Sequence, residues 1–269
     1  MWAAGWLKIA DPCKGRLDAN AGLSAAHSQH GCRVSKLAFH DVSLTIGGHE
    51  ILRDLSFALA PGSWTFLIGP PGAGKTMLLR LAAGQLAPTS GTVARPGAAA
   101  LVLHNAPLDD TKSAQANVAA AMAPAPDSDV RARTLLGDLG LDAYLAHEPF
   151  RLSRGYRGRL AIACAIAAAP AVLCLDDPFS PMDRSARART ADVLRRAAEE
   201  AGLAILMLSN DPLDALRHAD AIMTMTPGPT ARIAAIHACT PTPDASDDDL
   251  AAMPLAAMLE ATLWDETPS

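Results

Sequence analysis

The residues best suited to chemistry lie in one short glycine-rich stretch. Its glycines let the backbone curl, so that successive N–H groups point at anionic oxygens. Lys75 can reach the terminal phosphates of a nucleotide, and the hydroxyl of Thr76 can hold Mg²⁺. The predicted nucleotide-binding residues are Gly69, Pro70, Pro71, Gly72, Ala73, Gly74, Lys75, Thr76 and Met77.

The sequence on either side supplies the context that a phosphate-binding loop requires. Apolar residues 66–68 precede the stretch, as in a buried strand, and residues 77–83 have a helix-forming composition. The order strand, loop, helix directs the positive end of the helix at the same spot. The alternative is a glycine turn that binds nothing, but this glycine, lysine and threonine spacing arises by chance in roughly one chain in a hundred of this size.

Two acids follow a second apolar stretch. Residues 171–175 are typical of a buried strand, and Asp176 and Asp177 come directly after them. In phosphate-loop NTPases an aspartate in this place holds Mg²⁺ together with the loop threonine. We therefore predict Thr76 and Asp176 as metal-binding residues, and Asp177 as the group that orients or deprotonates the attacking water. Capping of a helix is the alternative for an acid at a strand end.

These groups need a scaffold of strands and helices. Alternating apolar residues within 42–59 predict an antiparallel β region on the N-terminal side. Strands expected at 171–176 and 204–208 flank a charged helix at about 183–201, an order typical of a parallel sheet. Residues 105–160 show helical spacing. The predicted class is α/β, a phosphate-loop NTPase with a mainly parallel sheet, the antiparallel region and an inserted α-helical subdomain.

Changes of composition predict the domain boundaries. Residues 1–32 are expected to be an extension without stable structure, and residues 33–239 form the nucleotide-binding domain. Residues 240–269 are expected to be a linker followed by a short C-terminal helix.

Composition argues against several classes of function. The net charge of −5 disfavours broad binding to nucleic acid, which needs a basic surface. The five cysteines lack the spacing of a metal site. No apolar run reaches the roughly 18 residues of a membrane span. We therefore expect a soluble, cytoplasmic protein whose membrane role, if it has one, comes through a partner.

Further motifs give the chain a resemblance to a known family, the nucleotide-binding subunits of ABC transporters. Within the family it resembles importers of the nitrate, sulfonate and taurine type, over about residues 34–235. Residues 176–183 resemble the family's catalytic acid and the turn that contacts a partner subunit, and residues 208–211 fall at its switch His-Asp pair. The family's signature loop is matched by Leu152, Ser153, Arg154, Gly155 and Tyr156.

This resemblance implies ATP and Mg²⁺ as ligands, and two subunits that sandwich two nucleotides head to tail. The signature loop of one subunit would then complete the other's site, because the N-terminus of its helix presents N–H groups to phosphate. The partners implied are a second ATP-binding subunit, in a homo- or heterodimer, and a membrane permease, with no nucleic acid. The location implied is the cytoplasm, at the inner face of the cell membrane through the permease.

Two binding positions depart from the family's pattern. Ile46 stands where an aromatic residue stacks on adenine, so affinity for the base should fall unless Phe39 or a histidine substitutes. Arg154 replaces the first glycine of the signature, where its side chain crowds the backbone but its guanidinium can pair with phosphate oxygens.

The catalytic positions depart as well. Asp177 replaces a glutamate, His104 replaces a glutamine that contacts metal and water, and Asn210 replaces the switch histidine. A misplacement of about 1 Å can slow catalysis around 10²-fold. We therefore predict Asp177, His104 and Asn210 as the catalytic residues of a site with intact nucleotide binding and slow hydrolysis. The alternative is a non-hydrolysing subunit, either the degenerate half of a heterodimer or a regulatory module.

Overall fold

The computed structural model describes residues 36–264. The predicted N-terminal extension, residues 1–32, lies outside the described residues, as do Cys13, Cys32 and the chain after residue 264.

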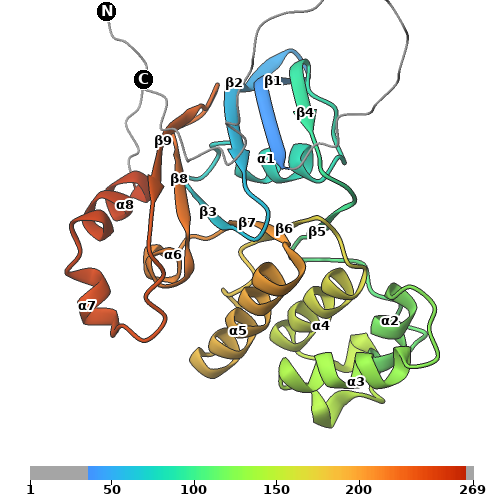
Figure 1. Ribbon diagram of the computed structural model, residues 1–269. Helices are drawn as coiled ribbons and strands as arrows, with labels where there is room; N and C mark the ends of the chain where they lie inside the picture. The colour runs from blue at the N-terminus through green and yellow to red at the C-terminus, as the bar shows by residue number, and fades with distance from the viewer. Residues whose placement is uncertain (1–35, 265–269) are drawn as a thin grey trace, which may run out of the picture. The chain divides into compact units, whose positions relative to one another are not determined.

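An antiparallel sheet of three strands forms from the first part of the described chain. Strands β1 (Leu37–Ile46) and β2 (His49–Leu59) make a hairpin around the Gly47-Gly48 turn, and β4 (Ser90–Ala94) pairs with the other edge of β1. Leu37, Phe39 and Leu55 are buried on its inner face, as alternating apolar residues require. The predicted antiparallel region is confirmed (Figure 1).

A second sheet of six strands carries the candidate site. Its strand order is β5-β6-β7-β3-β8-β9, and every neighbouring pair is parallel except β8 and β9. Strands β3 and β7 are buried along their whole length, as expected for strands with helices or a second sheet on both faces. The sheet consists of β3 (Trp64–Ile68), β5 (Ala99–Val102), β6 (Val172–Asp176), β7 (Ala204–Leu208), β8 (Ala221–Met225) and β9 (Ile233–Ala238). The mainly parallel sheet is thus confirmed.

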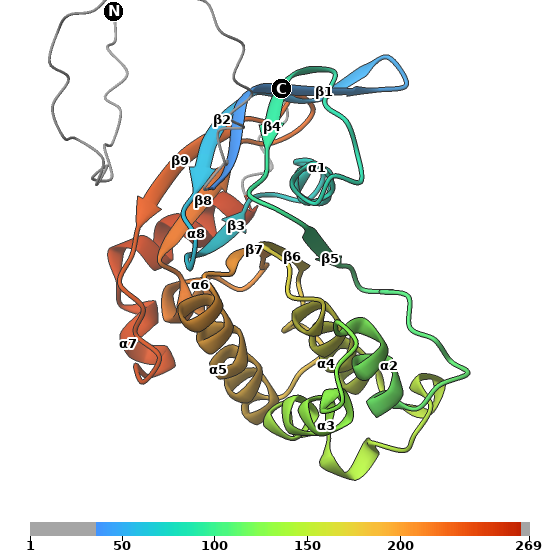
Figure 2. The same cartoon turned by 45° about the vertical axis from the view of Figure 1, so that its right-hand side comes forward.

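Helix α1 (Lys75–Ala82) lies between the two sheets (Figure 2). Its side chains Leu78 and Leu79 share one buried cluster with Leu55 of β2 and Leu206 of β7. Because α1 begins at the end of β3, this packing fixes the loop between them against both sheets.

The α-helical insertion has a small core of its own. It contains α2 (Ala114–Ala121), α3 (Ser128–Asp138) and α4 (Arg154–Ala167), with short 3₁₀ turns at Asp142–Tyr144 and Pro149–Arg151. Apolar residues of all three helices form one buried cluster, so the insertion packs as a unit. Its last helix runs past residue 160, the boundary predicted from the sequence.

The C-terminal part of the chain packs on the second sheet. Helix α6 (Pro212–His218) follows β7, and two helices follow β9, α7 (Asp247–Ala251) and α8 (Pro254–Trp264). The predicted short terminal helix corresponds to α8, and α7 is a further helix within the expected linker. Leu250 and Leu259 are buried in the same cluster as Trp64 of β3, because these short helices close the core on this side. None of the helices between residues 36 and 264 is long and apolar enough to cross a membrane.

Candidate nucleotide-binding site

The predicted phosphate loop connects β3 to α1. Gly74 has φ 77°, in the left-handed region, and a Cβ there would lie 2.9 Å from Cδ2 of Leu52 and 3.0 Å from Cγ2 of Ile51. Only glycine meets both demands, because it has no side chain to strain or to clash. The loop therefore rests on β2 at its helical end.

Lys75 is the one buried lysine of the described core, 9% exposed. Its Nζ donates to the carbonyl oxygens of Gly69 and Pro70, the latter at 2.9 Å. Burial lowers the pKa of its ammonium group, while the charges of Asp176 and Asp177 oppose that shift. A buried cation held only by neutral carbonyl groups in this loop fits an anion with several oxygens, such as a nucleotide phosphate.

The predicted metal-binding residues lie together. The Thr76 hydroxyl, in the first turn of α1, donates to Oδ2 of Asp176 at the end of β6 (3.1 Å). Mg²⁺ prefers oxygen ligands and is commonly held by one or two protein groups plus phosphates and water. One hydroxyl and one carboxylate beside the phosphate loop therefore fit this ion.

The predicted catalytic acid is paired with the predicted switch residue. The Nδ2 group of Asn210 donates to Oδ2 of Asp177 at 3.1 Å, and the backbone N–H of Asp177 donates to Leu208 at 3.0 Å. Burial raises the pKa of the Asp177 carboxyl, whereas the bond from Asn210 and the charge of His104 lower it. Asp177 has φ 47°, a left-handed conformation that aspartate tolerates better than most residues. The structure thus brings the two residues into direct contact.

His104 lies apart from this pair, in the loop after β5. It is exposed and lines a groove of about 540 Å³ with Arg154 and Arg157 of α4. It influences Asp177 through charge and, within the described residues, has no hydrogen bond to it. A water-contacting role for His104 remains a prediction.

The signature segment begins α4 as predicted. The Ser153 hydroxyl accepts a hydrogen bond from the Tyr156 N–H and caps the helix, while Arg154 is exposed. A Cβ on Gly155 would lie 2.7 Å from the carbonyl oxygen of Pro181, so this glycine permits close contact with the turn that follows Asp177. Between residues 36 and 264, no hydrogen bond joins residues 152–156 to the phosphate loop.

The residues proposed to bind the base have different surroundings. Ile46 is 45% exposed and is paired with His49 across the hairpin. Phe39 is 1% exposed and stacks on Phe57, with ring centroids 4.4 Å apart. The suggestion that Phe39 could stack on adenine was therefore wrong, because alternation on β1 turns its ring into the core.

Comparison with known proteins identifies the family. The family model described as ABC transporter matches residues 52–180. An aliphatic sulfonates import ATP-binding protein of Xanthomonas axonopodis is 33% identical over 204 residues, covering 71% of this chain and 81% of that protein. The chain belongs to the ABC transporter family. An Fe(3+) ions import ATP-binding protein of Rhodococcus jostii is 34% identical over 207 residues, which is 71% of this chain. The match spans only 60% of the length of that relative.

Solved structures show the same fold. A dimeric ATP-binding cassette in a post-hydrolysis state, bound to ADP and phosphate, superposes with a TM-score of 0.67 at 20% identity. The match covers 76% of this chain and 99% of that one. The ABC fold assigned from the two sheets and the helical insertion is therefore confirmed.

One neighbour of the phosphate loop in this ABC domain could not be predicted from the sequence. The loop between β8 and β9 reaches it, because a Cβ on Gly228 would lie 2.7 Å from the carbonyl oxygen of Gly72. The Thr230 hydroxyl donates to the carbonyl oxygen of Glu50 on β2 (3.3 Å). The Pro-Gly-Pro run at 227–229 signals a turn, but no sequence signal places that turn on the phosphate loop.

Proposed function

We propose that this chain is the ATP-binding subunit of an importer, which couples ATP binding and slow hydrolysis to solute transport through a membrane permease. The observation that carries the proposal is the buried Lys75, held by loop carbonyl groups beside the Thr76–Asp176 pair. The names of the relatives, an iron importer and a sulfonate importer, support import as the process. We favour a solute of the nitrate, sulfonate and taurine class, with selectivity residing in the permease and its binding protein.

The residues divide the work in the following way. Backbone N–H groups of the loop and Lys75 bind the phosphates, and Thr76 with Asp176 binds Mg²⁺. Mg²⁺ held by Thr76 and Asp176 would supply positive charge beside the phosphates. Asp177 orients the attacking water, and Asn210 holds the Asp177 carboxylate in place.

Slow turnover follows from the same contacts. Aspartate is one methylene shorter than the family's glutamate, so the carboxylate that Asn210 holds reaches less far toward the water. An asparagine also lacks the titratable ring of the family's histidine. The side chains that bind phosphate and metal, Lys75, Thr76 and Asp176, carry no such departure. We therefore expect phosphate and metal binding to be retained while hydrolysis is reduced.

The proposed assembly is a dimer beneath a permease, at the cytoplasmic face of the membrane. A capped helix that presents Ser153 and Gly155 at its N-terminus supports a phosphate contact in trans, because the same segment makes no bond to the loop of its own chain among the described residues. A homodimer or a heterodimer with a second ABC subunit satisfies this arrangement.

The first test is nucleotide binding by the purified chain. Titration calorimetry with Mg-ATP and Mg-GTP should show binding of both, and Lys75→Ala should weaken both alike by at least tenfold, since the lysine recognises phosphate. Lys112→Ala is the matched control, because Lys112 is a half-exposed lysine whose partner is Asp109. Absence of nucleotide binding in the wild type, or equal effects of the two substitutions, would contradict the proposal.

A further inference from the structure

Arg187 connects two segments that both end at the hydrolytic side of the site. It lies in the first turn of α5 (Arg184–Ala201), and its Nε donates to the carbonyl oxygen of Met182 at 3.2 Å. Met182 belongs to the turn that follows Asp177. The Nη1 group of Arg187 reaches Asp211 at 3.3 Å and Asp214 at 3.4 Å, across the site on α6. One side chain therefore ties the turn after β6 to the start of α6.

The contacts at the start of α6 lead directly to Asn210. The Asp211 carboxylate accepts the N–H of Leu213 at 2.9 Å and caps the helix, while its own N–H donates to the Ser209 hydroxyl at 3.1 Å. Asn210 lies between these two anchored residues, and its amide donates to Asp177. The position of the amide thus depends on the position of Asp211.

Asp214, the second carboxylate that Arg187 contacts, is buried and needs a neighbouring cation. The Asp214 side chain is only 10% exposed, and burial, followed by the charge of Asp211, raises the pKa of its carboxyl to about 6. The charges of Arg187 and Arg217 act in the opposite direction, and that of Asp177 adds to the rise. A buried carboxylate that loses its cation takes up a proton or moves toward water. Either response would loosen the first turn of α6.

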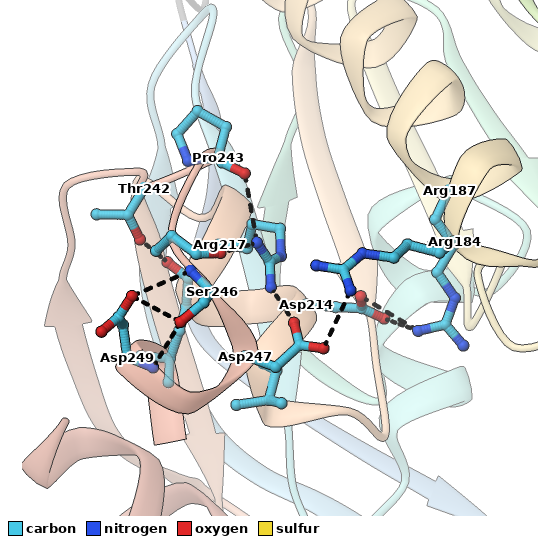
Figure 3. A network of polar contacts seen from close by, with 12 residues as sticks. Arg184, Arg187, Asp214, Arg217, Thr242, Pro243, Ser246, Asp247 and Asp249 are labelled. Atoms are coloured by element: carbon cyan, nitrogen blue, oxygen red, sulfur yellow. Dashed lines mark hydrogen bonds and ion pairs between the residues drawn. The ribbon is translucent and has the colours of Figure 1, made fainter. Parts of the chain in front are cut away.

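The other end of α6 is held by contacts of a different arginine. Arg217 donates to the carbonyl oxygen of Pro243 at 3.3 Å and pairs with Asp247 of α7. Figure 3 shows Arg187, Asp214 and this Arg217–Asp247 pair within one network of polar contacts. The contacts of Arg187 are therefore a polar tie at the end of α6 that adjoins Asn210, where the buried Ser209 also donates its N–H to the carbonyl oxygen of Leu67 at 3.4 Å.

We propose that Arg187 is a positioning residue, which keeps the amide of Asn210 on the carboxylate of Asp177 by holding the start of α6 to the Met182 turn. It touches neither nucleotide nor water in this role. Its contacts act through Asn210, and its charge also lowers the pKa of the Asp177 carboxyl. The inference rests on the proposed function, because it assigns Arg187 a part in ATP turnover. It also gives a route by which a shift of the turn after Asp177 reaches Asn210.

Amide hydrogen exchange tests the structural part of this inference on the full chain. In Arg187→Met, the amide of Leu213 should exchange at least tenfold faster, because its acceptor, the Asp211 carboxylate, loses the charge-assisted bond from Arg187. The amide of Asp211 should also exchange faster, because its own side chain is no longer held. Arg195→Met is the matched control, since Arg195 lies on the same helix with a similarly buried ion pair, to Asp220 at 3.0 Å. Unchanged exchange at 209–214 in Arg187→Met, or equal acceleration in the control, would overturn the inference.

ATP turnover tests the functional part through a double-mutant cycle. Arg187→Met should lower kcat about tenfold and leave the affinity for ATP within about twofold, as expected for a group that acts on the transition state. Because the contacts of Arg187 act through Asn210, adding Arg187→Met to Asn210→Ala should slow turnover much less than the same change slows the wild type. Multiplying effects in the double mutant, or a loss of ATP affinity instead of kcat, would overturn it.

These two experiments separate the inference from the proposed function. A wild-type chain that neither binds nor hydrolyses ATP would refute the proposed function, and the exchange measurement would still decide whether Arg187 fixes the Asn210 segment.

Discussion

At the scale of single residues, the candidate nucleotide site has the side chains that bind phosphate and metal, but it lacks a ring at Ile46 that could stack on the base. Lys75 and Thr76 have their partners in place, with the Thr76 hydroxyl 3.1 Å from Asp176. At the base end, Ile46 is exposed and has no ring, and the ring of Phe39 is buried against Phe57. Recognition should therefore depend on phosphate more than on base.

Replacement of Ile46 by tyrosine should strengthen nucleotide binding. An aromatic ring stacked on a base contributes about 1–3 kcal/mol, so the affinity for ATP should rise about tenfold. The wild type should prefer ATP over GTP by less than about tenfold, since it lacks that ring. Calorimetric titration of both proteins with both nucleotides decides this. A strong preference for ATP in the wild type would place another ring at the base.

The grouping of Lys75, Thr76 and Asp176 could be predicted because the phosphate loop and the paired acids combine residue type with spacing. Lys75, Thr76 and Asp176 are close to one another, as expected. The contact between Asn210 and Asp177 depends on β6 and β7 being neighbours, which no local pattern reveals. Arg187 was missed for the same reason, since an arginine in a charged helix looks like surface until α6 is placed opposite.

At the scale of elements, α6 carries two groups whose pKa values are shifted in opposite senses. Burial raises the pKa of the Asp214 carboxyl to about 6. Burial, with the charges of Arg217 and Arg195, lowers the pKa of His218 to about 4. His218 is stacked on Trp64 with ring centroids 5.4 Å apart, which keeps its ring in the core.

These two shifts predict opposing effects of pH on stability. The folded state binds a proton at Asp214 more tightly than the unfolded state, so this group favours folding as pH falls from about 6 toward 3.8. At His218 the unfolded state binds the proton more tightly, so that group costs stability as pH falls from 6.5 toward about 4. The two effects oppose each other, so the free energy of unfolding of the wild type should change little through these two groups as pH falls.

Replacing one of the two groups should reveal the effect of the other on the pH dependence of stability. Between pH 7 and 4.5, His218→Phe should lose about 2 kcal/mol less stability than the wild type, and Asp214→Asn about 2 kcal/mol more. Urea unfolding at both pH values provides the free energies, and comparing differences between pH values removes each variant's own cost. Parallel curves for all three proteins would show that neither group changes protonation on folding.

Strands and helices with a clear apolar pattern could be predicted from the sequence. Those stabilised mainly by long-range contacts could not. Strands β6 and β7 are unbroken apolar runs, so both were expected. Strand β9 is partly exposed and rich in alanine, and α7 has five residues, too few for a period to show. Both form because they cover β8 and α6, a long-range condition that a local pattern does not contain.

At the scale of the whole molecule, the proposed dimer divides each nucleotide site between two chains. The phosphate loop and the signature segment lie on different elements, and the described structure shows no bond between them within one chain. A site made from two copies is incomplete in either copy alone.

Mixing two inactive variants should therefore restore activity. Lys75→Ala removes the phosphate-binding lysine of the loop. Gly155→Asp disrupts the signature segment, because even a Cβ at this position would lie 2.7 Å from the carbonyl oxygen of Pro181. In a homodimer, random pairing of equal amounts leaves about a quarter of the sites intact, so turnover should recover to about that share of the unmutated protein. Steady-state ATP hydrolysis of the mixture and of each variant alone is the measurement. A mixture as inactive as its parts would indicate that both segments serve one chain's own site.

The most direct test of the central claim is steady-state ATP hydrolysis by the wild type, Asp177→Glu, Asn210→His and the double mutant, with ATP binding measured in parallel. Turnover should be slow in the wild type and should increase about tenfold or more in Asp177→Glu, because the longer side chain recovers the reach that aspartate lacks. The double mutant should exceed the two separate gains combined, since residues 177 and 210 are in contact, and ATP affinity should barely change. A double mutant that binds ATP normally and stays as slow as the wild type would contradict the account, and would identify the chain as a non-hydrolysing subunit.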